Sequence, residues 1–232
     1  MNRTSKVAQG AHDFVPLTGY CEYPQEVMLA RAGAFADELQ RRSTVRDFSS
    51  RLVPRGVIEE CLRAACAAPS GANQQPWRFV AVSNSAVKHQ IREAAESEEL
   101  EFYSRRAPPE WLKALAILGT DEHKPFLDEA PWLIAVFIER LGMKPDGTKE
   151  KRYYPDESVG LATGMLIAAL HTAGLATLTH TPSPMKFLNQ VLGRPVDLER
   201  PFLLLVTGYP ATDCKVPDIR RKPIDTLVTF IE

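Results

Sequence analysis

The stretch APSGANQQPW, residues 68–77, joins a predicted helix at 54–67 to a predicted strand at 78–83. Its glycine and small residues let a backbone come close to a flat ligand. Its asparagine and glutamine side chains can form hydrogen bonds with the edge of a ring. The Pro-Ser-Gly part alone is more typical of a turn between a helix and a strand. This stretch therefore leaves two interpretations open, a turn and a ligand-binding loop.

A basic stretch, RRSTVR at residues 41–46, precedes the helix at 54–67. Its three arginines and two hydroxyl side chains suit a phosphate group, because guanidinium forks and hydroxyls match phosphate oxygens. A short basic run alone is more often a solvated surface. The order and spacing of the two stretches together are more specific than either one alone.

The rest of the chain alternates helical patterns with short apolar runs bounded by turn residues. An arm at 215–232 follows and ends in a predicted strand at 227–231. These patterns predict an α+β fold and a single domain over 1–232, with a sheet packed around a buried helix. The remaining predicted helices are 24–41, 158–173 and 184–192, and the remaining predicted strands are 132–139 and 202–208.

The composition, 44% hydrophobic and 25% charged over 232 residues, is that of an ordinary globular domain. A net charge of −1 gives no support for nucleic acid or an anionic membrane as a partner. The cysteines and histidines show no metal-ligand spacing, so we expect no metal. Residues 1–17 lack a sustained apolar core, so we expect no signal peptide and a cytoplasmic protein.

Residues 159–178 carry no formally charged side chain and contain a GxxxG pattern at Gly160 and Gly164. A membrane span has both features. A helix at the centre of a globular protein or at a dimer interface has them as well. The threonine, glycine and histidine content of the segment favours the second interpretation, and we expect no membrane span.

Residues 96–125 form a charged insertion that we expect to be irregular. Glu99 and Tyr103 are four residues apart, so they share one face if this part is helical. Together with Lys124, they can hold an amino acid at both its ammonium and its carboxylate. The acidic run around Glu99, read alone, is typical of a solvated helix end.

In order and spacing, RRSTVR, the following helix and PSGANQQPW resemble the FMN-dependent nitroreductase superfamily. The resemblance covers nearly the whole chain from about residue 38 onward, and includes TLTHTP at 177–182 and VPDIRRKP at 216–223. It implies a nitroreductase-like fold with a central mixed sheet flanked by helices. It also implies an intertwined homodimer that binds FMN at the subunit interface, with the arm at 215–232 embracing the partner.

Within the superfamily, the insertion resembles the lid of the iodotyrosine deiodinases, which has the same Glu, Tyr and Lys spacing. The resemblance implies that the Thr181 side chain bonds flavin N5 and acts in catalysis. The implied FMN-binding residues are Arg42, Ser43, Thr44, Arg46, Pro69, Ser70, Gly71, Thr179, His180, Thr181 and Arg221.

The resemblance also implies how a halotyrosine is held. The backbone N–H of Ala72 takes the phenolate, and Glu99 pairs with the ammonium. Lys124 and Tyr103 take the carboxylate. We expect the lid to become ordered on substrate, because these contacts matter chiefly when solvent is excluded. Animal members carry an N-terminal membrane anchor, which residues 1–17 do not match.

The implied reaction is FMN-dependent reductive dehalogenation of halotyrosines. NAD(P)H is the expected ultimate electron donor, directly or through a separate flavin reductase. A general nitroreductase or quinone reductase is one alternative, but it has no need of the Glu99, Tyr103 and Lys124 trio. A flavin-binding or amino-acid-binding protein without turnover is another, but it has no evident need of a hydroxyl at N5.

Overall fold

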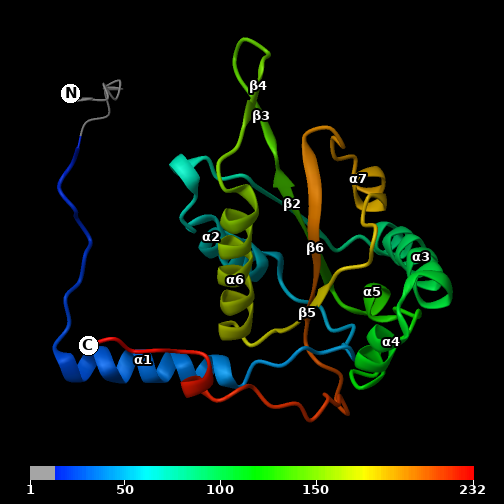
Figure 1. Cartoon of the computed structure of the whole chain (residues 1–232), viewed down its shortest axis with the longest axis horizontal. Coiled ribbons are helices and arrows are strands. Elements are labelled where there is room, and N and C mark those ends of the chain that lie inside the picture. The colour runs from blue at the N-terminus through cyan, green and yellow to red at the C-terminus, as the bar shows by residue number, and fades with distance from the viewer. Residues whose placement is uncertain (1–13) are drawn as a thin grey trace. The chain divides into compact units, whose positions relative to one another are not determined.

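The computed structural model describes residues 14–232, which divide into two units, 14–38 and 39–232. The first unit holds most of helix α1 (Gln25–Gln40), none of whose residues is buried. The second unit contains the sheet and all the other helices among the described residues (Figure 1). The helix predicted at 24–41 is confirmed, and the single domain over 1–232 stays a prediction.

The sheet has four strands in the order β1-β2-β6-β5. Neighbouring strands pair antiparallel throughout, and the apolar runs at 132–139 and 202–208 form the two central strands, as the sequence predicts. The edge strand β5 was not predicted, because threonine and histidine interrupt its apolar pattern. The strands are β1 (Trp77–Val82), β2 (Trp132–Glu139), β5 (Ala176–His180) and β6 (Glu199–Gly208).

We expected a mixed sheet. Among residues 14–232, its strands are all antiparallel, and a single isolated bridge supplies the parallel pairing. Thr44 forms an isolated parallel bridge with Thr177 of β5. Next to it, the Val45 backbone N–H donates to the Thr177 carbonyl at 3.1 Å. The basic stretch therefore runs along the open edge of β5 and is not a strand of its own.

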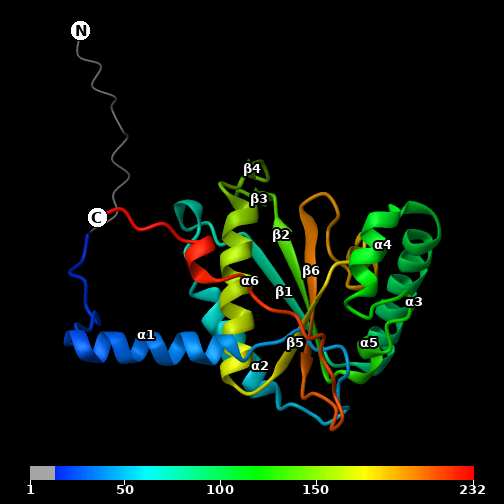
Figure 2. The same ribbon diagram turned by 60° about the horizontal axis from the view of Figure 1, so that its bottom comes forward.

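Helices cover both faces of the sheet (Figures 1 and 2). On one face, α2 (Arg55–Cys66) and α6 (Pro155–Thr172) pack against strand residues such as Ile134 and Leu205. On the other, α3 (Ser85–Glu101), α5 (Phe126–Glu129) and α7 (Phe187–Val191) pack near Leu133 and Leu204. Alternate residues of β2 and β6 thus serve two cores, as strands buried on both faces require.

Helix α6 was expected at the centre of the protein or at a dimer interface, and within the described chain it is buried along one side only. It lies on one face of the sheet, with Leu166 and Leu170 fully buried against it. Its opposite side exposes 53% of Leu161 and 37% of Met165, and among residues 14–232 no atom lies within 4 Å of a Cβ added to Gly160 or Gly164. The helix therefore has apolar residues on two sides, and the described chain covers only the side that faces the sheet. No helix in residues 14–232 is both long and apolar enough to cross a bilayer.

Two further differences from the predictions concern short segments. The hairpin of β3 (Leu141–Met143) and β4 (Lys149–Lys151) was not predicted. The strand predicted at 227–231 is wrong, because the arm contains only a short turn of helix, η3 (Ile224–Thr226). Every residue of 220–232 is exposed, so within the described chain this segment has no strand beside which it can pair.

Leu205 is fully buried in β6, whereas 83% of Leu52 is exposed. We expect Leu205→Ala to lower the free energy of unfolding by about 2–5 kcal/mol, because it leaves a cavity between sheet and helices. Leu52→Ala should change it by no more than about 0.5 kcal/mol. Urea unfolding followed by circular dichroism measures both, and equal effects of the two changes would contradict this assignment of the core.

Candidate active site

A cavity of about 430 Å³ lies where the basic stretch meets the C-terminal arm. It collects four guanidinium groups and three hydroxyls, and none of its lining residues is acidic. The sequence-predicted set Arg42, Ser43, Thr44, Arg46, Thr179 and Arg221 is therefore brought together here. The lining residues not predicted are Leu118, Val216, Pro217, Ile219 and Arg220.

The C-terminal arm is fastened to this cavity by Arg221. Its guanidinium donates to the carbonyl oxygens of Arg42 at 2.7 Å and Gln40 at 3.0 Å. These bonds connect positions about 180 residues apart in the chain, so no local pattern predicts them. They bring the neighbouring Arg220 to the cavity, a fourth cation whose only sequence signal was its place in a basic run.

The cavity is strongly cationic. Burial lowers the pKa of Arg42, and the nearby charge of Arg221 lowers it further. Burial also lowers the pKa of Arg46. Within the described chain, no carboxylate pairs with Arg42, Arg46 or Arg220. Crowded cations without a counter-charge are stabilised by an anion, and guanidinium forks with hydroxyls suit a phosphate.

A second cavity of about 210 Å³ adjoins the first, since Arg46 and Thr179 line both. The end of β5 forms one wall, with Thr181 just beyond the strand. The insertion at 96–125 forms the other wall, which includes Glu99, Tyr103 and Lys124, the three residues predicted to hold an amino acid. The remaining lining residues are Phe102, Trp111, Leu115, Thr120, Phe126, Leu178, His180 and Ser183.

The insertion is largely helical, so its expected irregularity is wrong. Helix α3 continues through Glu99 into a turn of π-helix, η2 (Phe102–Arg106), followed by α4 (Pro109–Ala116). Phe102 holds this turn, with its ring edge-on to Tyr103 at 5.6 Å and to Trp111 at 5.1 Å between ring centroids. The π-turn adds a residue to the helix and re-aims the side chains that follow, a feature frequent at functional sites.

The predicted trio meets inside this wall. Lys124 Nζ lies 3.4 Å from Glu99 Oε2 and 5.5 Å from the centre of the Tyr103 ring. Burial raises the pKa of Glu99, although the charges of Lys124 and Arg106 oppose the rise. Burial likewise raises the pKa of Tyr103. An anion, a cation and a phenol thus converge on one small cavity.

Three residues outside the predicted trio hold this arrangement. Thr120 accepts a hydrogen bond from Lys124 Nζ at its hydroxyl (3.2 Å) and from the Tyr103 hydroxyl at its carbonyl (3.1 Å). Lys124 Nζ also donates to the Asp121 carbonyl. Glu96 accepts from the Lys124 backbone N–H at 2.6 Å and pairs with Arg92 at 2.8 Å. The contacts of Glu96 with Lys124 and of Tyr103 with Thr120 join positions 28 and 17 residues apart, so no local spacing predicts them.

The loop at 69–75 does not join the two cavities. It enters β1, whereas Thr181 follows β5, and these strands form opposite edges of the sheet. With strands about 4.8 Å apart, three spacings separate the edges by roughly 14 Å. The predicted FMN-binding residues Pro69, Ser70 and Gly71, and Ala72 with them, line neither cavity.

Within the described chain, the N–H groups of Ser70 and Ala72 are the two in the loop at 69–75 that have no hydrogen-bond partner. Gly71 donates its N–H to Ser158 Oγ at 3.3 Å, and Gln75 donates its N–H to Ser70 Oγ at 3.0 Å. The N–H groups of Asn73 and Gln74 also have partners within the loop. The N–H of Ala72 has none among residues 14–232, so in a run of five it alone is available to a ligand.

The family model described as "Nitroreductase family" matches residues 39–209. The chain belongs to the nitroreductase family. An iodotyrosine deiodinase from Haliscomenobacter hydrossis is 51% identical over 209 residues, covering 90% of this chain and 93% of that relative. One from Homo sapiens is 41% identical, covering 90% of this chain and 72% of that relative. Within the nitroreductase family, the chain thus belongs with the iodotyrosine deiodinases.

Solved structures agree with this placement. A crystal structure of oxidized iodotyrosine deiodinase bound to FMN and 3-iodo-L-tyrosine is 34% identical, with a TM-score of 0.71. The match covers 84% of this chain and 100% of that one. A BluB-like flavoprotein from Clostridium difficile, 21% identical with a TM-score of 0.64, covers 85% of this chain and 98% of that one. That second likeness shows the nitroreductase fold alone.

His180 is the last residue of β5. Its side chain is buried and lies edge-on to Phe126, with 5.6 Å between ring centroids. Its Nε2 atom has no hydrogen-bond partner among the described residues. Burial, then the charges of Lys124 and Arg46, lower the pKa of His180 to about 3. The imidazole is therefore neutral.

The lowered pKa of His180 makes stability depend on pH. Between about pH 3 and about pH 6.5, the unfolded chain binds a proton at this position that the folded protein does not. The free energy of unfolding therefore decreases as the pH is lowered. The expected decrease from pH 7.5 to pH 5.5 is about 1.4 kcal/mol. In His180→Leu this part of the pH dependence should disappear. Urea unfolding at both pH values tests it, and an unchanged difference between the two pH values would contradict it.

Proposed function

We propose that this chain is an FMN-dependent iodotyrosine deiodinase, which removes halide reductively from halogenated tyrosines. The observation that supports this proposal most is a pair of adjoining cavities. One is cationic, and the other is lined by Glu99, Tyr103 and Lys124. In the reaction, the carbon–halogen bond breaks and halide leaves with its electrons. The ring carbon gains hydrogen from an electron pair and a proton, and tyrosine is released.

The cationic cavity fits the phosphate of FMN, which supplies the electrons when bound. Four guanidiniums without an acidic neighbour favour a doubly charged anion. Arg42, Ser43, Thr44, Arg46 and Arg221 hold the phosphate. Arg46 and Thr179 line both cavities, so a flavin anchored by its phosphate extends toward Thr181. There the Thr181 hydroxyl donates to N5, with Thr179 and His180 beside the ring through their backbone.

The trio binds the amino-acid part of the substrate. In the free protein, Glu99 and Lys124 compensate each other's charge. A zwitterion inserted between them presents its ammonium to Glu99 and its carboxylate to Lys124, so each buried charge keeps a counter-charge. Tyr103 turns its hydroxyl from the Thr120 carbonyl to the substrate carboxylate. A lid that closes on the substrate makes these pairs strong, because water is excluded.

The free N–H of Ala72 holds the phenolate oxygen of the substrate. A fixed backbone donor aimed at an anionic oxygen stabilises it without reorganisation. This donor precedes β1, whereas Thr181 follows β5 at the opposite edge of the sheet of the same chain, roughly 14 Å away. It therefore serves the site of a second copy, together with Pro69, Ser70 and Gly71 at the flavin ring.

A homodimer follows from this division of the site. The uncovered side of α6, with Leu161 and Met165, supplies an apolar interface. The arm at 215–232 exposes further apolar residues, including 81% of Phe230, and embraces the partner. We place the protein in the cytoplasm. NAD(P)H is the ultimate electron donor, directly or through a separate flavin reductase.

The deciding experiment is iodide release. We expect the FMN-loaded protein, reduced anaerobically with dithionite, to release iodide rapidly from 3-iodo-L-tyrosine and slowly from 2-iodophenol, which lacks the zwitterion. An iodide electrode or ion chromatography measures both. Release from neither compound, together with brisk reduction of a nitroaromatic, would identify a general nitroreductase instead.

Because Glu99 pairs with the ammonium of the substrate, binding of 3-iodo-L-tyrosine should depend on this side chain and on pH. We expect Glu99→Gln to weaken 3-iodo-L-tyrosine binding about tenfold or more, because a charge-assisted contact is lost. In the unchanged protein, affinity is full above the raised pKa of Glu99 and falls as the pH drops through it. Titration of the flavin absorbance measures both effects. An equal loss of affinity for 2-iodophenol would exclude this role of Glu99.

The dimer is tested with Leu161→Lys, which places a charge on the uncovered side of α6. We expect light scattering to report a dimer for the unchanged protein and a monomer for the variant. FMN affinity should fall about tenfold or more, since the partner's loop is lost. Lys149→Leu, on the exposed hairpin strand β4, is a control that should leave both properties unchanged. A monomer that binds FMN as tightly as the dimer would overturn the proposal.

A further inference from the structure

The loop at 71–75 holds an unfavourable backbone. Ala72, Asn73 and Gln75 have φ angles of 49°, 53° and 48°, in the left-handed region that non-glycine residues rarely adopt. Such conformations persist only where surrounding contacts impose them. Ala72 itself is exposed and makes no hydrogen bond through its N–H within the described chain. Its orientation therefore depends on how its neighbours are held.

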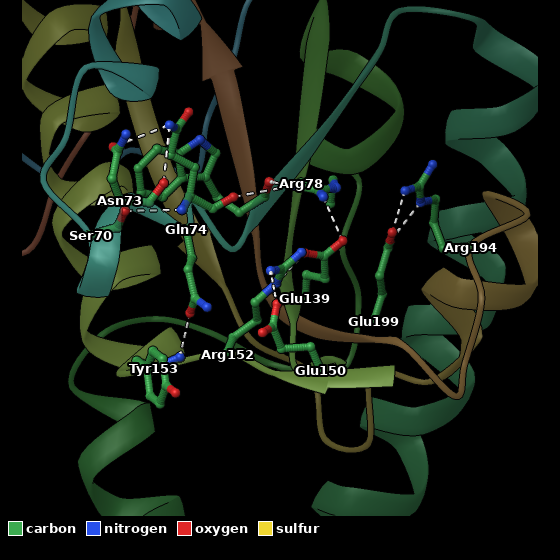
Figure 3. Close-up of polar contacts among 12 residues, drawn as sticks. Ser70, Asn73, Gln74, Arg78, Glu139, Glu150, Arg152, Tyr153, Arg194 and Glu199 are labelled. Atoms are coloured by element: carbon green, nitrogen blue, oxygen red, sulfur yellow. Dashed lines mark hydrogen bonds and ion pairs between the residues drawn. The ribbon is translucent and has the colours of Figure 1, made fainter. Parts of the chain in front are cut away.

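The loop is docked on the start of helix α6 at three points. Gly71 donates its N–H to Ser158 Oγ at 3.3 Å. Gln74 Oε1 accepts the Tyr153 backbone N–H at 2.7 Å (Figure 3). A Cβ on Gly71 would lie 2.5 Å from the Tyr153 carbonyl oxygen, so only glycine allows this approach. The docking points lie on both sides of Ala72 in the chain.

Ser158 ties the loop to the helix. Only 2% of this residue is exposed, and its hydroxyl donates to the Tyr154 carbonyl at 2.6 Å while it accepts from Gly71. The receiving segment is itself anchored, because Arg152 pairs with Glu139 of β2 at 2.7 Å. Ser158 thus fixes the Ser70–Gly71 peptide to α6, and this peptide directly precedes the one that carries the Ala72 N–H.

We propose that Ser158 and Gln74 are positioning residues that aim the Ala72 N–H at the phenolate oxygen of the substrate. The inference rests on the proposed function and deepens it. Both residues act through the loop and touch neither the flavin nor the reacting carbon. Their removal should therefore weaken recognition of the phenolate and leave recognition of the amino-acid part unchanged.

A matched control lies on the same helix. Thr163 is buried, and its hydroxyl donates to the carbonyl four residues earlier at 2.7 Å, as that of Ser158 does. Within the described chain it makes no hydrogen bond with the loop. Ser158→Ala and Thr163→Val each delete one buried hydroxyl of α6, so a general loss of helix stability affects both. Only Ser158→Ala removes the partner of Gly71.

The test compares 3-iodo-L-tyrosine with 3-iodo-L-phenylalanine, which lacks the phenolic oxygen, on the oxidised FMN-loaded protein. We expect Ser158→Ala to bind iodotyrosine about tenfold more weakly and iodophenylalanine unchanged, with FMN retained. The pKa of the bound phenol, from the pH dependence of Kd, should rise by about one unit, because a hydrogen bond to the charged form is lost. Thr163→Val should change neither.

Gln74→Met provides a second variant, which removes the acceptor for Tyr153 at the loop surface, and we expect the same selective loss. Equal weakening of both ligands, or an unchanged pKa of the bound phenol, would overturn the positioning role. If the unchanged protein does not distinguish iodotyrosine from iodophenylalanine, the phenolate contact of the proposed function fails instead. The two failures are therefore distinguishable.

Discussion

The strand order β1-β2-β6-β5 is the constraint on which the site depends. It sends the loop at 69–75 and Thr181 to opposite edges of the sheet. The two central strands are buried on both faces, and a shift of register by one residue would exchange the two cores. The separation is therefore fixed, and in the proposed dimer each chain supplies two half-sites. Two-fold symmetry is the simplest arrangement that joins them into two complete sites.

Charge is balanced differently in the two cavities. Around Arg42 and Arg46 no carboxylate lies among the lining residues, so the counter-charge has to come from a ligand. Under the lid, Glu99 and Lys124 supply it to each other. Burial of an uncompensated charge is costly, so the first cavity favours a bound anion and the second favours a molecule with both charges. This difference suits a tightly held cofactor and an exchangeable zwitterionic substrate.

Several local rules are broken where the proposed chemistry lies. Three non-glycine residues near Ala72 have left-handed backbones, a π-turn interrupts the helix beyond Glu99, and His180 is buried without a partner for Nε2. Strain and unsatisfied groups of this kind persist when surrounding contacts hold them. The hydrogen bonds that Ser70 and Ser158 accept from the loop N–H groups of Gln75 and Gly71 are one such set of contacts.

The sequence by itself determined the central strands, helices α2 and α6, and the residue types at both cavities, because each depends on neighbours a few residues away. It also supplied the likeness that pointed to FMN and a lid. Only the tertiary structure decided which side of α6 stays uncovered, that 227–231 has no strand beside it, and that Arg220 and Thr120 join the site. These depend on contacts between distant segments, such as Gly71 with Ser158, 87 residues apart. Local patterns do not encode such pairings, because many folds satisfy the same local preferences.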